Sequence, residues 1–271
     1  MATGKARHDS TPGEEPSGRG PLLSLLNGIR VLNSFTVAEP VLGVNEIARR
    51  VDLHKSTVSR ILATLELVGL VEREEHSGRF RLGVGVIGLA GPLLAHLDVR
   101  RIAYQGLEDL VRLTGETGAL AFWNGYESIV VEQIPSPKLV KHTTPLGARF
   151  SKASSASVQV FLADKPEAEV RRLLREGLIS LGTGSEEQLF ERLAQVRAQG
   201  YALNDGETDP EELSLSAPVR DHRQAVVGAI LLSAPRLRCT PFMIQDFVKR
   251  VVETAAQVSS RLGADHLDGD K

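Results

Sequence analysis

The sequence has a single cysteine, no long apolar run and no N-terminal signal. Cys239 has no partner for an internal disulfide, which is typical of a protein in a reducing compartment. No apolar stretch reaches the ~18 residues of a membrane span. The N-terminus also lacks the apolar core of a signal peptide. We therefore predict a cytoplasmic protein that has no contact with a membrane.

Neither sign of charge is in excess. The formal net charge is −2, and residues 1–82 hold 11 Lys and Arg against 10 Asp and Glu. Attraction of the whole protein to nucleic acid is therefore not expected. Any affinity for DNA must come from a local patch of cations.

Catalytic and metal-binding motifs are also missing. There is no GxSxG motif and no Walker lysine, and the seven histidines show no metal-ligand spacing with Cys239 or with paired carboxylates. His222 stands in a predicted turn, where a surface role is favoured over general-base chemistry. Gly83–Gly88 matches GxGxxG, but that pattern binds dinucleotides inside a βαβ unit, and a helical pattern follows it here. We predict no enzymatic activity, no cofactor and no metal.

The most informative stretch is Val44–Leu82. Two amphipathic helical patterns, at residues 45–51 and 54–67, are joined by a tight connection. Two short strand patterns, at residues 71–73 and 79–82, follow around a glycine turn. This order predicts a winged helix-turn-helix, whose second helix enters the major groove of DNA.

The second helical pattern has two unlike faces. Val58, Leu62 and Leu65 form an apolar face, and no acidic residue lies between His54 and Leu65. The other face carries hydroxyls and cations, which suits the major groove. Two packed helices with solvated polar faces would explain the apolar spacing, but not this cluster of donors at the helix start. The predicted DNA-binding residues are Asn45, Arg49, His54, Lys55, Ser56, Thr57, Ser59, Arg60, Arg79 and Arg81, with Arg49, Arg79 and Arg81 mainly on phosphates.

This segment resembles the IclR family of bacterial transcriptional regulators. The matching stretches are Glu46–Arg50 and Leu53–Leu65 and, near the other end, Gly200–Ala202 and Ala217–Asp221. The family's usual proline ahead of Lys-Ser-Thr is His54 here, which removes a rigid first-turn residue but leaves the contact face. The resemblance implies an α+β protein with an N-terminal winged helix-turn-helix, a linker helix and a GAF-like effector-binding domain.

Composition and pattern divide the chain into four parts. Residues 1–20, rich in Gly, Pro, Ser and charges, are predicted to be a disordered tail. Residues 21–82 form the DNA-binding domain, 83–98 the linker helix and 99–265 the effector-binding domain. An apolar stripe from Leu22 to Phe35 predicts a first helix that packs beneath the helix-turn-helix. Three glycines and Pro92 make the linker a poor helix, so we expect a bend or a late start there.

The C-terminal part alternates strand and helix patterns. They predict a hairpin over 119–132, a strand at 139–143, strands at 213–219 and 226–233, and helices at 153–163, 167–176, 186–199 and 241–262. Ser154 or Ser155 is the expected cap of the 153–163 helix. Helices that cover an antiparallel sheet make an α+β domain.

A ligand site is predicted where the 153–163 helix begins. Small residues there leave backbone N–H groups open and the helix dipole adds positive potential, so a carboxylate is a natural guest. An ordinary capped helix explains the same residues equally well. The family resemblance implies that small organic acids are held by this helix start and by the sheet opposite. The effector-binding positions so implied are Leu139, Ala156, Ser157, Asn204, Ser214, Leu231 and Ser233.

Three of these positions depart from a common small-acid pattern of the family. Asn204 stands where an aspartate is frequent, Ser214 where a cysteine can occur, and Leu231 where glyoxylate- or pyruvate-type members have a serine. A leucine in place of a hydroxyl makes the pocket more apolar. We therefore favour an aromatic or longer-chain carboxylate as the effector.

These observations together predict a ligand-responsive transcriptional regulator, with repression favoured. A single winged helix makes few contacts, so we expect a homodimer, or a dimer of dimers, on a pseudo-palindromic double-stranded operator. Two alternatives remain. A small-acid-processing enzyme would show turnover by the fragment 99–262, and a protein-interaction module would show no salt-dependent affinity for DNA.

Overall fold

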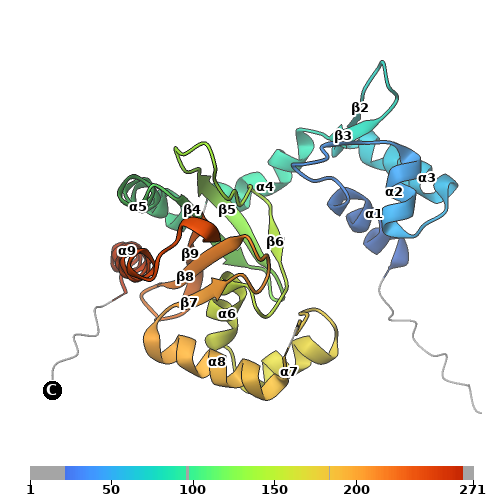
Figure 1. The fold of residues 1–271 in the computed structure, drawn as a ribbon. Coiled ribbons are helices and arrows are strands. Elements are labelled where there is room, and N and C mark those ends of the chain that lie inside the picture. The colour runs from blue at the N-terminus through green and yellow to red at the C-terminus, as the bar shows by residue number, and fades with distance from the viewer. Residues whose placement is uncertain (1–21, 96–97, 183, 265–271) are drawn as a thin grey trace, which may run out of the picture. The chain divides into compact units, whose positions relative to one another are not determined.

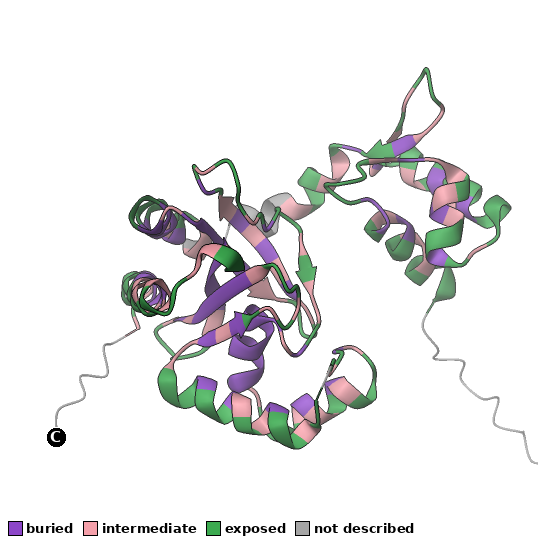
Figure 2. Cartoon of the chain, viewed as in Figure 1, coloured by how far each residue is buried: buried purple, intermediate pink, exposed green. Residues whose placement is uncertain are grey.

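The computed structural model describes residues 22–95, 98–182 and 184–264. These residues fold as two compact units, which divide in the sequence between Ile87 and Gly88 (Figure 1). Each unit has its own buried core (Figure 2). The predicted tail, residues 1–20, lies outside the described residues. In the part of the chain that is described, no helix is both long and apolar enough to span a bilayer.

The N-terminal unit combines helices with a small antiparallel sheet. Its elements are α1 (Leu23–Asn33), β1 (Val41–Leu42), α2 (Val44–Val51), α3 (Lys55–Leu67), β2 (Val71–Arg73) and β3 (Phe80–Leu82). The strand order is β1-β3-β2, so β3 is paired on both sides. Helices α2 and α3 form the predicted helix-turn-helix, and the β2–β3 hairpin forms its wing.

Local sequence fixes the ends of α2 and α3. The Glu46 carboxylate accepts a hydrogen bond from the Gly43 amide (2.7 Å) at the start of α2. This bond, together with nearby cations such as Arg79, keeps the pKa of Glu46 below its usual value. Helix α2 ends at Asp52, which takes the left-handed conformation (φ 52°) that aspartate tolerates. His54 caps α3, because its Nδ1 accepts a hydrogen bond from the Ser56 amide (3.3 Å).

Only the C-terminal half of α1 packs on the helix-turn-helix. Val31 and Phe35 are buried in the core of the N-terminal unit, and Leu32 is partly buried against it. The prediction that the whole apolar stripe packs beneath the helix-turn-helix is wrong for its first half, because this small core offers no side chains to the first turns of α1. The apolar residues left exposed there are Leu22, Leu23, Leu25, Leu26 and Ile29.

The linker becomes helical at its third residue. Helix α4 (Gly85–Ala95) runs through Pro92 without interruption, so the glycines and Pro92 do not prevent a helix in this part of the linker. Its beginning is packed closely against the turn after α3. A Cβ atom on Gly83 would lie 2.3 Å from the Gly69 carbonyl oxygen, and one on Gly85 would lie 2.6 Å from it. The GxGxxG match therefore reflects close backbone packing and not a dinucleotide loop.

The C-terminal unit is a six-stranded antiparallel sheet covered by helices on both faces. Its elements are α5 (Asp98–Thr114), β4 (Thr117–Trp123), β5 (Ser128–Ile134), β6 (Arg149–Phe150), α6 (Ala156–Ala163), α7 (Glu167–Arg175), α8 (Glu186–Gln199), β7 (Ala202–Asp205), β8 (Glu212–Arg220), β9 (Val226–Pro235), the 3₁₀ helix η1 (Arg236–Arg238) and α9 (Pro241–Arg261). The strand order is β6-β5-β4-β9-β8-β7. Helices α5 and α9 lie on one face and α6 on the other, with α7 and α8 packed outside α6 (Figure 1).

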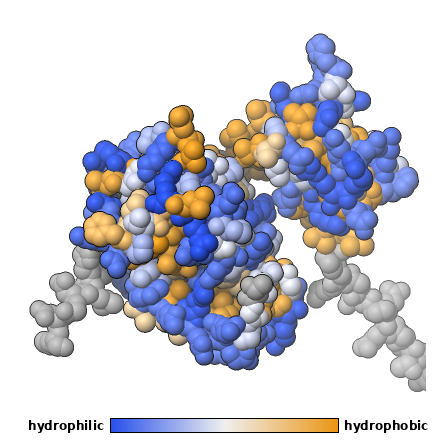
Figure 3. All heavy atoms as spheres, in the orientation of Figure 1, coloured by the Kyte–Doolittle hydropathy of each residue, from blue (hydrophilic) through white to orange (hydrophobic). Residues whose placement is uncertain are grey.

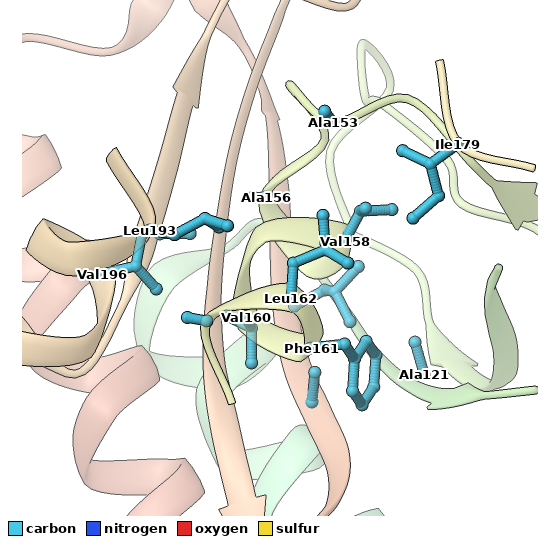
Figure 4. Close-up of a cluster of buried hydrophobic side chains, with 14 of the residues drawn as sticks. Ala121, Ala153, Ala156, Val158, Val160, Phe161, Leu162, Ile179, Leu193 and Val196 are labelled. Carbon is cyan, nitrogen blue, oxygen red and sulfur yellow. The ribbon is translucent and has the colours of Figure 1, made fainter. Parts of the chain in front are cut away.

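Alternation along the strands creates two separate cores. Leu213 and Leu215 of β8 pack with Leu107 of α5 and Val251 of α9. On the other face, every residue of α6 is buried. Val158, Phe161 and Leu162 of α6 pack there against Ala121 of β4 and Leu193 of α8 (Figure 4). This arrangement confirms the predicted α+β class.

The predicted strand at residues 139–143 does not form. These residues are a loop, and the edge of the sheet is the short strand β6 instead. Backbone carbonyls of this loop accept hydrogen bonds from side chains instead of from a neighbouring strand. The Val140 carbonyl accepts a hydrogen bond from Arg238 (2.7 Å), and the His142 carbonyl accepts one from Thr117 (2.6 Å).

Candidate DNA-binding surface and ligand site

Helix α3 separates a buried face from an exposed one. Val58 and Leu62 are fully buried in the core of the N-terminal unit. The hydroxyls and cations predicted to read DNA lie on the exposed face: Lys55, Ser56, Thr57, Ser59 and Arg60. Within the described residues no carboxylate pairs with Lys55 or Arg60. The face is therefore open to solvent and carries a local positive charge, although the whole chain is slightly acidic.

Three further predicted residues of the helix-turn-helix are exposed to solvent. Asn45 and Arg49 of α2 are exposed. His54 is also exposed, and its Nδ1 lies 2.7 Å from the Ser56 hydroxyl as well as capping the helix. His54 therefore has a structural role at the start of α3, and it orients the Ser56 side chain.

The two wing arginines are tied to carboxylates of the same unit. Arg79 donates to Glu46 (2.7 Å) and to the Val41 carbonyl (3.0 Å), so it joins the wing to α2 and β1. Arg81 donates to Glu72 from both Nε (3.1 Å) and Nη2 (2.9 Å). The sequence predicted both side chains to position phosphates. The structure gives Arg79 an internal partner 33 positions away, which periodicity alone could not reveal.

The predicted effector residues of the sheet lie in two neighbouring rows. In the first row Asn204, Ser214, Ser233 and Thr117 stand opposite one another across β7, β8, β9 and β4. The second row holds Leu231. Leu231 belongs to the α6-side core, and strand alternation places Asn204, Ser214 and Ser233 on the same side. The structure therefore brings these four residues together beneath α6, and all of them are buried.

Helix α6 begins without a side-chain cap. Ser155 is the N-cap residue, but its side chain makes no capping hydrogen bond. The prediction that a serine caps this helix is therefore not met at Ser155. Ala156 and Ser157, which open the helix, are buried. An uncapped, buried helix start with small side chains has backbone N–H groups and a positive dipole end available for a partner.

The side-chain amide of Asn204 is already hydrogen-bonded to other residues of the protein. Its Nδ2 donates to the Ser154 carbonyl (3.0 Å) and to Thr208 (2.6 Å), and its Oδ1 accepts from the Glu207 amide (2.9 Å). An aspartate could not donate the first two of these bonds. Asn204 therefore holds the loop before α6 against the loop after β7. The Ser233 hydroxyl makes one longer hydrogen bond, of 3.2 Å, with the hydroxyl of Thr144.

Leu139 does not join this group, because its side chain is 100% exposed. It lies in a loop that is anchored by a residue which the sequence did not identify. Glu116 is fully buried, and its carboxylate accepts hydrogen bonds from Lys138 (2.7 Å) and from Nε (2.9 Å) and Nη2 (2.5 Å) of Arg238. The bond to Glu116 raises the pKa of Arg238. No local pattern could have signalled this cluster, since its members come from three separate segments.

Two family descriptions match the chain, one in each unit. The IclR helix-turn-helix domain matches residues 24–75, and the C-terminal domain of the bacterial transcriptional regulator IclR matches residues 92–260. The chain belongs to the IclR family of transcriptional regulators. The resemblance seen in the sequence is therefore confirmed. The exposed face of α3 lies within the matched helix-turn-helix domain, and the buried polar row lies within the matched C-terminal domain.

Similar proteins cover nearly the whole chain. XynR of Escherichia coli strain K12 is 28% identical over 244 residues, which cover 89% of this chain and 97% of XynR. The glycerol operon regulatory protein of Streptomyces griseus is 32% identical over 245 residues, covering 89% and 96%. A solved IclR-type regulator from Alicyclobacillus acidocaldarius is 27% identical, with a TM-score of 0.74, and covers 89% of this chain and 99% of its own. These relatives are transcriptional regulators and not enzymes, which confirms the prediction that this IclR-family chain is not an enzyme.

Proposed function

We propose that this IclR-family protein is a repressor that binds a pseudo-palindromic operator as a homodimer and responds to a small carboxylate. The single observation that carries the proposal is the exposed face of α3. Its hydroxyls and unpaired cations stand on a helix whose other side is locked into the core by Val58 and Leu62. Such a helix presents donors for base edges and phosphates in one rigid frame.

The cations of α3 provide a direct test of operator binding. We expect Lys55→Ala and Arg60→Ala each to weaken binding to the upstream operator by roughly 5- to 150-fold, the effect of losing about 1–3 kcal/mol of base or phosphate contact. A lost phosphate contact should also reduce the salt slope of log affinity by about one. The measurement is a fluorescence titration of labelled operator at several salt concentrations.

The control for this test is Arg112→Ala. It removes the same charge from an exposed position on α5, where Asp109 is the only carboxylate that pairs with Arg112 among the residues that the structure describes. We expect Arg112→Ala to bind the operator with an affinity within about twofold of the wild type. Unchanged affinity of both α3 variants at moderate salt would instead favour a protein-interaction role for the N-terminal unit.

A homodimer would cover apolar surface that the N-terminal unit leaves open. A hollow of about 590 Å³ lies between α1 and α3; its apolar lining includes Leu25, Ile29 and Leu65, and Thr57 and Arg60 of the proposed DNA-binding face also border it. Val84 and Ile87 of the linker segment are also exposed. Apolar surface gathers on this unit in Figure 3. Exposed apolar surface of this kind marks an interface, and two-fold pairing through it would match a pseudo-palindrome.

The proposed effector site lies between the α6 start and the buried polar row. The uncapped backbone N–H groups would attract a carboxylate, and Ser233 and Ser214 supply hydroxyl donors across the sheet. Leu231 contributes an apolar wall, which favours an aromatic or longer-chain acid. A neighbour of the same fold from Microbacterium hydrocarbonoxydans, 24% identical with a TM-score of 0.73, was solved with 4-hydroxybenzoate. Repression is supported by the similarity to the transcriptional repressor IclR of Escherichia coli strain K12, which is 27% identical over 250 residues.

The effector proposal is tested by titrating the operator complex with acids of different size. We expect 4-hydroxybenzoate to change operator affinity at a concentration at least roughly tenfold lower than pyruvate, because Leu231 replaces a hydroxyl donor with an apolar surface. Leu231→Ser should bring the effective concentrations of 4-hydroxybenzoate and pyruvate closer together. Pyruvate acting at the lower concentration would contradict the preference for aromatic acids.

A further inference from the structure

One cavity of the C-terminal unit lies between α6 and α8. It has a volume of about 420 Å³, and its polar lining includes Ser154, Gln159, Gln188, Arg192 and Glu207. None of the residues predicted to bind the effector lines it. It meets the proposed effector site through Ser154, whose carbonyl accepts hydrogen bonds from both Gln159 (2.9 Å) and Asn204 (3.0 Å), and through Glu207, whose amide donates to Asn204 (2.9 Å).

Gln159 lines this cavity, and its side-chain amide is held in a fixed orientation. The side chain is 1% exposed, and its Nε2 is committed to the Ser154 carbonyl. This bond fixes the orientation of the amide, so the other terminal atom is the acceptor Oε1. That oxygen is buried and has no hydrogen-bond partner among the described residues. A buried acceptor without a partner is costly, so a group that donates to it gains more than it would in water.

The other polar groups of the cavity limit the charge of a ligand. Arg192 is already neutralised, because its Nη1 lies 2.6 and 2.8 Å from the two carboxylate oxygens of Glu207. Glu191 also lines the cavity. A carboxylate ligand would therefore meet the Gln159 acceptor and two acidic side chains, without an unpaired cation to balance them. Gln188 adds a donor, because its Oε1 already accepts from the Ser185 amide (3.0 Å), which leaves its Nε2 free to donate.

We propose that the α6–α8 cavity is a second ligand site, for a neutral polyhydroxy compound such as a pentitol or an aldopentose. A hydroxyl group both donates and accepts. One hydroxyl can donate to Oε1 of Gln159 while others accept from Gln188 and from the remaining N–H groups of Arg192. The proposal goes beyond the regulator function, because it adds a ligand of a different chemical class at a different place in the C-terminal unit.

The test is calorimetric titration of the full-length protein with xylitol, D-xylose, butyrate and n-butylamine. We expect xylitol or D-xylose to bind saturably. Gln159→Met, which removes the amide but keeps most of the volume, should weaken that binding at least roughly tenfold. Gln195→Trp should weaken it to a similar extent, because Gln195 is exposed at the edge of the cavity and a ring there blocks it. Ala194→Trp places the same ring on the adjacent exposed position outside the cavity lining and should leave binding unchanged.

The outcomes separate this proposal from its rivals. Gln195→Trp does not touch the buried amide, so it decides the matter even if Gln159→Met fails to fold. Absence of saturable binding by both neutral probes overturns the proposal, as does binding that Gln195→Trp leaves unchanged. Binding of n-butylamine or butyrate alone overturns the assigned ligand class. Operator affinity of the ligand-free protein is measured in parallel, so a negative result here remains distinguishable from failure of the regulator function.

Discussion

Full-length protein carrying Leu25→Asp and Ile29→Asp is expected to be monomeric and to bind a palindromic operator at least roughly a hundredfold more weakly than the wild type. A linked second half-site commonly adds 10²- to 10⁴-fold in affinity, and this gain is lost with the dimer. Carboxylates in the hollow between α1 and α3 would have to be desolvated on pairing. Leu25 and Ile29 are both exposed in the monomer, so the two substitutions should leave the fold of the N-terminal unit intact. Light scattering during gel filtration and operator titration measure the two effects.

The matched control is Leu237→Asp, which makes the same kind of change at a leucine that is 98% exposed in the C-terminal unit. It should leave operator affinity within about twofold of the wild type, as most surface substitutions do. A double aspartate variant that stays dimeric and retains full operator affinity would show that the subunits pair through another surface.

Arg238→Ala is expected to destabilise the C-terminal unit by about 2–4 kcal/mol. Breaking a buried ion pair typically costs about 3–5 kcal/mol, and Lys138 remains as a partial partner for the fully buried Glu116. The same change frees the Val140 carbonyl, so the loop that carries Leu139 should exchange its amide hydrogens faster. Denaturant unfolding followed by Trp123 fluorescence measures the stability, because this single tryptophan lies in the C-terminal unit.

Arg236→Ala is the control for this variant. Arg236 pairs with Asp205 (2.6 Å), but both side chains are nearly half exposed, so the loss should stay below about 1 kcal/mol. Equal losses for the two arginine variants would mean that Glu116 does not depend on Arg238.

The parts of the fold that the sequence predicted well are those governed by local spacing. The apolar residues of α3 recur at helical spacing, and the wing strands flank a glycine turn, so both elements could be assigned before the structure was known. The alternation in β8 and β9 likewise gave two strands of nearly the observed length. Each of these signals lies within about 20 residues of chain, the range over which periodicity is informative.

What could not be predicted depends on partners far away in the sequence. Arg79 has a cationic side chain suited to a phosphate. Only the fold shows that this side chain forms an ion pair with Glu46. Glu116 and Arg238 are 122 positions apart, so their buried ion pair left no pattern in the sequence. The exposed first half of α1 was missed for a related reason, since an apolar stripe predicts burial without stating against which surface.

The effector region shows the same limit at the level of single atoms. The strand register brings Asn204, Ser214 and Ser233 into one row. The hydrogen bonds of Asn204 nevertheless hold two loops together. Leu139, assigned to the same region, points away from the protein on a loop whose anchor is Glu116.

The contact of Gly83 and Gly85 with the Gly69 carbonyl has a mechanical consequence. A Cβ atom on Gly83 or Gly85 would clash with the turn after α3, so the first turn of α4 is packed directly against the backbone of that turn. The first turn of α4 must therefore move with the C-terminal end of α3 as one rigid piece. Any reorientation along the connection has to be absorbed by residues that come later in the chain.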